Sequence, residues 1–304
     1  MKIFNSITGF VFLCLMCILP YCKKDDVIPS TTDDAITVIK NDASLSIYYL
    51  IATRANAESY INSSSGILAP IDNAFISAGI TPNTVSSFSQ AYSDSLIKYM
   101  SVPSGMSFNG VVGTRVNFVS GLGLPVYGDS TATNVYFNGV STASVTPTRG
   151  YNTSIYKLNK VLDLPYPTIS QFISRDSSLS FYNEAFTRAN WSASLTGGTY
   201  TLFAPTNDAF RSAGYVDIQS IDSVNMNTLT QLLKFNTAQN YYYLNDLATQ
   251  SNITTLQGGA ITLTNTDGSI ILTGITNPSP ATILNSGSLA GNALVYKVSK
   301  ILLP

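Results

Sequence analysis

Two short stretches of the chain place a lysine three residues after a serine, the spacing that some acyl transferases use around a nucleophilic serine. They are Ser95-Leu96-Ile97-Lys98 and Ser154-Ile155-Tyr156-Lys157. Neither is accompanied by the Ser-Asp-Asn or Lys-Thr-Gly motifs that complete such a site. We therefore interpret both matches as chance, and we expect no catalytic residue in either.

The residue types that most enzymes need for acid-base or metal chemistry are scarce. The sequence contains no histidine, and its three cysteines, Cys14, Cys17 and Cys22, all lie in the first 22 residues. This excludes Cys/His zinc sites, Cys–His catalysis, Ser–His–Asp triads and disulfides in the rest of the chain. The two glutamates, Glu58 and Glu184, are far apart. We expect no enzyme, no metal site and no cofactor.

Aromatic side chains are the remaining candidates for a binding function. The chain has 18 tyrosines, among them the run Tyr241, Tyr242 and Tyr243, and a single tryptophan, Trp191. Tyr and Trp suit glycan stacking or protein contacts because they combine an apolar ring with a polar group. The same side chains also fill cores and cover sheet edges. Both interpretations stay open, and these four residues are the candidate ligand contacts.

The overall composition indicates a globular protein of the cell exterior. Apolar residues make up 45% of the chain, and charged residues 11%, against roughly 25% in average soluble proteins. The formal net charge is −1, with no basic block along the sequence. Binding to nucleic acid through phosphate neutralisation is therefore excluded as an expected function.

The first 22 residues are typical of an export signal. An apolar run from about Ile7 to Leu19 is shorter than the roughly 20 residues of a membrane span. An uncleaved membrane anchor is the alternative. Leu19-Pro20-Tyr21-Cys22 resembles a bacterial lipobox, in which Cys22 would be lipidated, although Tyr21 replaces the usual small residue. Acyl chains would hold the protein on a membrane.

Residues 23–32 are polar and indicate a short tether. The segment CKKDD is similar to the start of many surface-displayed lipoproteins of Bacteroidetes-type bacteria. That resemblance implies a lipid-anchored protein of the outer membrane or cell surface. Which side of the membrane it faces stays open.

The rest of the chain repeats one pattern twice. Residues 42–56 (DASLSIYYLIATRAN) and 176–190 (DSSLSFYNEAFTRAN) share nine of fifteen positions. Residues 66–75 (GILAPIDNAF) match 201–210 (TLFAPTNDAF), and two further blocks follow in the same order. A period this long predicts two tandem domains. Prolines in Leu164-Pro165-Tyr166-Pro167 mark the boundary, which gives domains at 33–165 and 166–304.

The repeated ten-residue stretch predicts a buried strand that turns into a short helix. A proline ends the strand because it cannot donate to the ladder. Asp72 and Asn207 are the predicted helix caps, and Thr206 is a weaker alternative because its counterpart in the first repeat is Ile71. The phenylalanine three residues later should point inward, and Gly79 and Gly214 should end the helices. The motif residues are Ala69, Pro70, Asp72, Phe75, Ala204, Pro205, Asn207 and Phe210.

Each repeat reads as helices followed by strands. Apolar residues at helical spacing in 42–56 and 176–190 predict a helix whose start Asp42 or Asp176 would cap. Residues 86–100 predict another helix, whose apolar set includes Phe88 and Tyr92. Glycine turns then separate short apolar segments. The predicted class is α+β with a mostly antiparallel sheet system.

At these blocks the sequence resembles the fasciclin domain family. TLFAPTNDAF, LLKF and LVYKVSKILLP carry the resemblance in the second repeat, and GILAPIDNAF, LIKY and SIYKLNKVLDLP carry it in the first. The resemblance implies a β-sandwich wedge with helices along one side and an extracellular, usually adhesive, role. The family's Tyr-His pair is Tyr99-Met100 and Phe235-Asn236 here. An adhesive mechanism that uses that histidine is not expected.

Two functions follow as expectations. The first is a non-catalytic adhesion or interaction lipoprotein that binds extracellular protein or matrix. The second is a glycan-binding accessory lipoprotein of a polysaccharide-uptake system. The partners are therefore a membrane, through the lipid anchor, and an extracellular protein or glycan.

Overall fold

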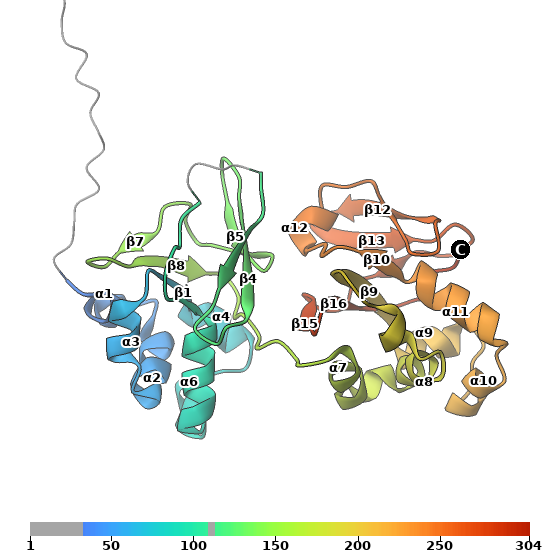
Figure 1. Cartoon of the computed structure of the whole chain (residues 1–304), viewed down its shortest axis with the longest axis horizontal. Coiled ribbons are helices and arrows are strands. Elements are labelled where there is room, and N and C mark those ends of the chain that lie inside the picture. Colours follow the sequence, from blue (N-terminus) through green and yellow to red (C-terminus); the bar gives the residue numbers. More distant parts are fainter. Residues whose placement is uncertain (1–32, 109–112) are drawn as a thin grey trace, which may run out of the picture. The chain divides into compact units, whose positions relative to one another are not determined.

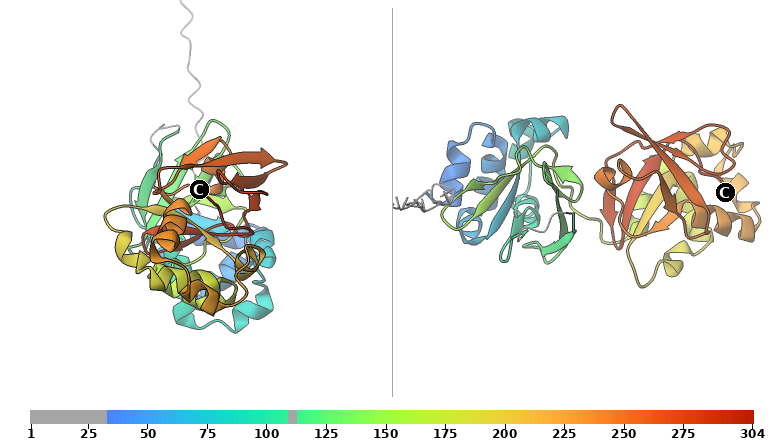
Figure 2. Two further views of the ribbon diagram at one scale, coloured as in Figure 1. Left: turned by 90° about the vertical axis from the view of Figure 1, so that its right-hand side faces the viewer. Right: turned by 90° about the horizontal axis from the view of Figure 1, so that it is seen from above.

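A computed structural model describes residues 33–108 and 113–304. The signal segment, the lipobox with Cys22 and the tether at 23–32 lie outside the described residues. The described chain forms two repeats of one α+β fold, and in each repeat most of the helices gather on one side of the central strands (Figure 1). A single connecting segment joins the repeats (Figure 2).

The first repeat begins with helices and ends with strands, as the sequence predicts. Its helices are α1 (Ala35–Asn41), α2 (Ser46–Ala55), α3 (Glu58–Ser63), α4 (Asp72–Ser77), α5 (Pro82–Ser86) and α6 (Gln90–Tyr99). Its strands are β1 (Gly66–Pro70), β2 (Ser101–Val102), β3 (Val116–Val119), β4 (Pro125–Ser130), β5 (Val135–Phe137), β6 (Val140–Ser141), β7 (Thr148–Arg149) and β8 (Ser154–Leu158).

The second repeat follows the same order. Its helices are α7 (Ile169–Arg175), η1 (Ser177–Leu179), α8 (Ser180–Arg188), η2 (Trp191–Ser194), α9 (Asn207–Ser212), α10 (Ile218–Asp222), α11 (Met226–Phe235) and α12 (Leu244–Leu247). Its strands are β9 (Tyr200–Pro205), β10 (Thr237–Gln239), β11 (Asn252–Thr254), β12 (Ala260–Thr266), β13 (Ser269–Thr273), β14 (Ala281–Thr282), β15 (Ser288–Ala290) and β16 (Ala293–Val298).

Each repeat contains two four-stranded sheets with matching strand orders. They are β2-β1-β8-β7 and β3-β4-β5-β6 in the first repeat, and β10-β9-β16-β15 and β11-β12-β13-β14 in the second. Most neighbours are antiparallel, as predicted. The exception in each repeat is the central pair, because the closing strand runs parallel to the corner strand, with Leu68 opposite Tyr156 and Phe203 opposite Tyr296.

The predicted corner between strand and helix is present in both repeats. Strands β1 and β9 end at Pro70 and Pro205, and Ala69, Ala204, Phe75 and Phe210 are buried. Gly79 and Gly214 follow the helices at φ of +75° and +95°. Such left-handed backbone favours glycine, which has no Cβ to clash with the neighbouring carbonyl oxygen.

The predicted capping roles of Asp72 and Asn207 are wrong. Ile71 and Thr206 are the N-caps of α4 and α9, and the Thr206 hydroxyl accepts from Ala209 N at 3.4 Å. Asp72 and Asn207 instead accept from backbone N–H groups in the first turn of an earlier helix of their repeat, α2 or α8. Asp72 Oδ1 accepts from Ile47 N at 2.8 Å, and Asn207 Oδ1 from Phe181 N at 3.1 Å. The corner therefore closes the open amide end of α2 or α8.

The capping role predicted for Asp176 is confirmed, because Asp176 is the N-cap of η1, which leads directly into α8, and its side chain accepts from Ser178 N at 2.9 Å. The role predicted for Asp42 needs correction, because α2 begins only at Ser46 and Asp42 accepts from Ser44 N in the turn before it. Both carboxylates use one oxygen for these bonds. Their other oxygen pairs with a lysine of the closing strand. The distances are 2.9 Å for Lys157 to Asp42 and 2.9 Å for Lys297 to Asp176. The same ion pair thus joins the first and last elements of both repeats.

Each repeat has its own buried core. One apolar cluster runs from Ala35 to Leu162, with Leu164 packed against it. The clusters of the second repeat contain buried residues from Ile169 onward, and Tyr166 packs against one of them. The change from one core to the next therefore falls around Pro165.

Candidate functional site

The aromatic residues predicted as ligand contacts are mostly packed inside the second repeat. Trp191, Tyr241 and Tyr243 are 2%, 8% and 1% exposed, and Tyr242 is half-buried. Trp191 donates from Nε1 to Thr237 Oγ1 at 3.4 Å. These exposures leave three of the four rings little surface for a ligand, as expected from the core-filling interpretation.

Tyr241 and Tyr243 instead contact the first repeat. The Arg115 guanidinium lies 4.9 Å from the centre of the Tyr243 ring and donates to the Tyr241 carbonyl at 2.9 Å. It also pairs with Asp129 at 3.0 Å and with Asp246 at 2.6 Å. Burial opposes the charge of Arg115, but the two carboxylates outweigh it and raise the pKa of the guanidinium. Arg115 therefore links the repeats while satisfying two acidic groups.

The two Ser-x-x-Lys matches do not form nucleophilic sites. Ser95 donates its hydroxyl to the Ala91 carbonyl, and Lys98 pairs with Asp94 at 2.9 Å. In the second match, Lys157 is the partner of Asp42. Both ammonium groups are paired with carboxylates, so neither lysine is placed as a base for its serine.

A polar cleft beside the connecting segment is the strongest candidate for a binding site. We call it the linker cleft. Its volume is about 450 Å³, within the usual range for small-molecule sites. It is lined by Tyr92, Asp163, Leu164, Pro165, Tyr166, Pro167, Arg175 and Ser288.

The walls of the linker cleft are held by the fold around them. The Tyr166 backbone bonds to Leu289 O at 2.8 Å and accepts from Gly291 N at 2.9 Å, which fixes the connecting segment to β15. The Tyr166 ring meets Phe172 edge-on at 5.0 Å. Two prolines beside Tyr166 restrict the backbone further. The cleft is therefore largely formed before any ligand arrives.

Tyr92 forms another part of the wall, and its position corrects a sequence expectation. Its helical spacing predicts a core residue, but 42% of the side chain is exposed. The ring is fixed by Phe88, which it meets edge-on at 4.8 Å. Burial, followed by the nearby Asp163 carboxylate, raises the pKa of Tyr92. The phenol and this carboxylate both line the linker cleft.

Two charged side chains of the linker cleft have unused hydrogen-bonding capacity. Asp163 and Arg175 are both exposed. Within residues 33–108 and 113–304, neither makes a side-chain hydrogen bond or ion pair. Partial burial raises the pKa of Asp163, because surrounding protein atoms replace water without supplying a counter-charge.

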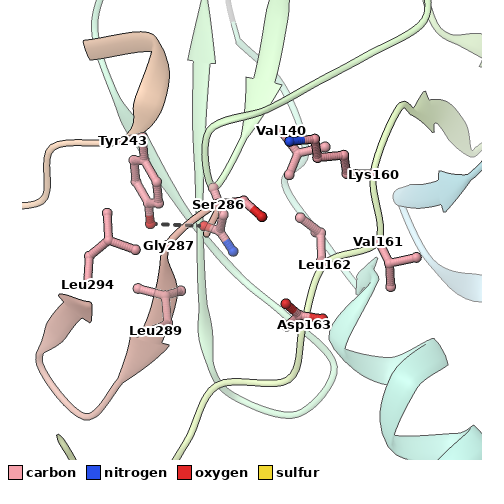
Figure 3. A pocket seen from close by; sticks show the side chains of 11 residues that line it. Val140, Lys160, Val161, Leu162, Asp163, Tyr243, Ser286, Gly287, Leu289 and Leu294 are labelled. Atoms are coloured by element: carbon pink, nitrogen blue, oxygen red, sulfur yellow. Dashed lines mark hydrogen bonds between the residues drawn. The ribbon is translucent and has the colours of Figure 1, made fainter. Parts of the chain in front are cut away.

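A small hollow of about 40 Å³ adjoins the linker cleft and shares Asp163 with it. Figure 3 shows Asp163, Leu162 and Lys160 from the end of the first repeat, with Tyr243, Leu289 and Leu294 from the second. The Tyr243 hydroxyl donates to Asn138 Oδ1 at 3.3 Å. The volume of this small hollow suits a water molecule rather than an organic ligand.

Sequence reasoning missed the linker cleft. It identified the prolines as a boundary but assigned no binding role to Tyr92, Asp163 or Arg175. These residues are far apart in the sequence and belong to no motif. The available signal was a boundary segment, Asp163 to Pro167, in which a carboxylate and a tyrosine flank rigid prolines.

No helix in the described part of the chain is long and apolar enough to cross a membrane.

Comparisons with known proteins identify similarity to fasciclin proteins. The chain is 23% identical over 157 residues to transforming growth factor-beta-induced protein ig-h3 of Oryctolagus cuniculus, covering 51% of this chain and 22% of that relative. A solved FAS1 domain pair from the insect cell adhesion molecule Fasciclin I is 14% identical, with a TM-score of 0.41, and the match covers 85% of this chain and 96% of that one. Residues 177–304, most of the second repeat, match the model of the Fasciclin domain family.

Proposed function

We propose that the protein is a non-catalytic interaction module of the cell exterior, built from two fasciclin-type domains and anchored by lipid at Cys22. Fasciclin domains generally serve in cell adhesion and interaction, and the family match in the second repeat is the observation that carries this proposal. The expected partner is an extracellular protein or matrix.

The first repeat supports the proposal through its likeness to the second. Both have the same sheet orders, the same parallel central pair and the same lysine–aspartate bridge. The equivalent contacts of Asp72 and Asn207 strengthen the likeness. We infer that the first repeat is also a fasciclin-type domain, although the family match begins at residue 177.

The lipid anchor is proposed from the sequence around Cys22 and the polar tether that follows. Mass spectrometry of the protein from its native membranes should find an acylated N-terminal Cys22, with cleavage after Tyr21. A Cys22→Ser variant should lose the anchor. An unmodified Cys22 in a chain that is still membrane-bound would contradict the proposal.

Adhesion is tested with intact cells that carry the protein. Cells displaying it should bind immobilised matrix protein or neighbouring cells more strongly than cells that express the Cys22→Ser variant, which is not held on the membrane. Protease shaving should remove the repeats from intact cells if they face outward. Equal adhesion by both cell types, with equal protein amounts, would argue against this function.

Glycan binding is the second candidate, and the linker cleft favours it. Tyr92 and Tyr166 line the cleft together with unpaired polar groups. An accessory lipoprotein of a polysaccharide-uptake system would use such a site to hold sugar near the membrane. Binding to a glycan array, without binding to matrix protein, would select this candidate over the first.

A further inference from the structure

The chemistry of the linker cleft limits which ligands it can hold. Asp163 brings one negative charge and Arg175 one positive charge, so the cleft as a whole favours neither anions nor cations. The carboxylate only accepts hydrogen bonds at neutral pH, and the guanidinium only donates them. Ser288 and the two tyrosines add hydroxyl groups that do both. A matching ligand needs many groups that donate and accept at once.

The apolar part of the lining narrows the choice further. Tyr92, Tyr166, Pro165 and Pro167 provide ring surfaces, and their contacts hold them in place. A pyranose ring presents C–H groups on its faces and hydroxyls around its edge, so it can use both kinds of surface. The volume of about 450 Å³ is sufficient for one or two such rings.

We propose that the linker cleft binds a neutral saccharide of one or two pyranose rings, with Asp163 and Arg175 hydrogen-bonding its hydroxyls and Tyr92 and Tyr166 contacting its ring faces. This inference deepens the glycan-binding candidate and rests on it. It assigns the binding site to the junction of the repeats, rather than to the buried tyrosine run at 241–243.

The pre-formed walls have a consequence for affinity. Because Tyr92 and Tyr166 are already held by Phe88 and Phe172, little side-chain freedom is lost when a ring binds. Asp163 gains hydrogen-bond donors that the free protein does not provide. Replacing one charged hydrogen-bond partner of a ligand typically weakens binding about tenfold or more.

The test is a titration of the full chain with defined sugars, in which binding is measured by calorimetry and by saturation-transfer NMR. The probes are maltose, cellobiose, lactose and N,N′-diacetylchitobiose at up to about 10 mM, the range for weak binding sites. At least one should bind, and Asp163→Asn and Arg175→Gln should each weaken it by about tenfold or more. Asp163→Asn keeps side-chain size, Arg175→Gln shortens the side chain but keeps it polar, and both positions are exposed, so the fold should persist.

Matched controls separate the cleft from general surface effects. Asp208 and Arg211 form an exposed pair on α9, with side chains 90% and 54% exposed, and they do not line the cleft. Asp208→Asn and Arg211→Gln should leave sugar affinity unchanged. Sugar binding that survives both cleft variants, or failure of every probe to bind, would overturn the proposal. Selective binding of glycine or a short peptide, with no sugar response, would also overturn it.

The adhesion assay distinguishes failure of this inference from failure of the adhesion function. If no sugar binds but displayed protein still supports adhesion, only the saccharide proposal falls. If sugar binds in the cleft but displayed protein supports no adhesion, the glycan-binding candidate replaces the adhesive one.

Discussion

Asp72 and Asn207 occupy the same place in the two repeats and do the same work with different side chains. Each side chain accepts a backbone N–H from the first turn of α2 or α8 and a second bond from a serine hydroxyl, Ser46 or Ser180. Asp72 uses its two oxygens for these bonds, and Asn207 uses Oδ1 for both. An acceptor is needed at this position, and a negative charge is not. The residue at the equivalent position of the other repeat is therefore the conservative replacement to test: asparagine for Asp72 and aspartate for Asn207.

Asp72→Ala should lower the free energy of unfolding by about 1–2 kcal/mol, because the Ile47 N–H loses its acceptor. Asp72→Asn should cost much less, since asparagine serves in the second repeat. Urea titration measures both. Asp208→Ala, at an exposed site, is the control and should change stability by less than about 0.5 kcal/mol. Equal losses for the alanine and asparagine variants would contradict this role.

The lysine–aspartate bridges should make stability depend on pH in the acid range. Burial raises the pKa of Asp42 and Asp176, but bonds from Ser44 or Ser178 and from Lys157 or Lys297 outweigh it, so both pKa values lie below 3.8. Their folded-state pKa values are below the unfolded value of about 3.9. They therefore stabilise the fold above that pH, and the stabilisation is lost as pH falls through the folded pKa.

The double variant Asp42→Asn/Asp176→Asn should show a flatter decline of stability below about pH 4 than the wild type. Urea midpoints measured at several pH values between about 2 and 6 would reveal the difference. The exposed Asp208→Asn serves again as the control. An unchanged pH profile in the double variant would show that the bridges do not contribute.

At the scale of elements, the features that are easiest to predict from sequence are those that a few neighbouring residues determine. The proline that ends β1 or β9, the inward phenylalanine and the glycine after the helix could all be predicted, because each depends on local backbone geometry. Asp72 and Asn207 were wrongly assigned as caps of α4 and α9 because the N–H groups that they accept from lie 25 and 26 residues earlier in the chain. Sequence spacing does not indicate which helix end such a side chain will reach.

Strand pairing shows the same limit. The alternation in the closing segments predicts strands, but it does not reveal that β8 and β16 run parallel to β1 and β9. That arrangement depends on the path of the whole intervening chain. Tyr92 was misjudged for a related reason, since helical spacing defines a face but not what covers it.

Gly214→Ala should cost about 1–2 kcal/mol of stability, because the residue adopts φ of +95°. No atom within 4 Å would meet the added Cβ, so the cost comes from the backbone alone. Gly198→Ala is a matched control, since its nearest neighbour would be 3.7 Å away and its φ is ordinary. The control should be neutral or slightly stabilising. Thermal unfolding of both variants provides the measurement.

At the scale of the whole molecule, the linker cleft depends on residues that only the folded chain brings together. Tyr92 comes from α6, Arg175 from the end of α7 and Ser288 from the start of β15. The repeat and its α+β class could be predicted from sequence, because duplicated blocks are visible directly. The site could not, because no single block contains it.

Arg115→Gln should loosen the contact between the repeats, because Asp129 and Asp246 lose their shared cation. We expect a loss of about 1–3 kcal/mol, as for other half-buried charge pairs. Calorimetry should show two separated transitions, and proteases should cut faster near Pro165. Arg211→Gln, which removes an exposed pair within α9, should leave both readouts unchanged. A single unshifted transition in Arg115→Gln would rule out the linking role.

The parallel pairing of each closing strand with its corner strand has a consequence for biosynthesis. Gly66 pairs with Ser154, and Tyr200 with Ala293, so each central sheet joins segments about 90 residues apart. Neither sheet can be completed until the last residues of its repeat leave the ribosome. On the export route proposed from the N-terminal segment, the chain would have to stay unfolded until it had been threaded through a membrane. This late completion would help to keep each half threadable until its final strand is made.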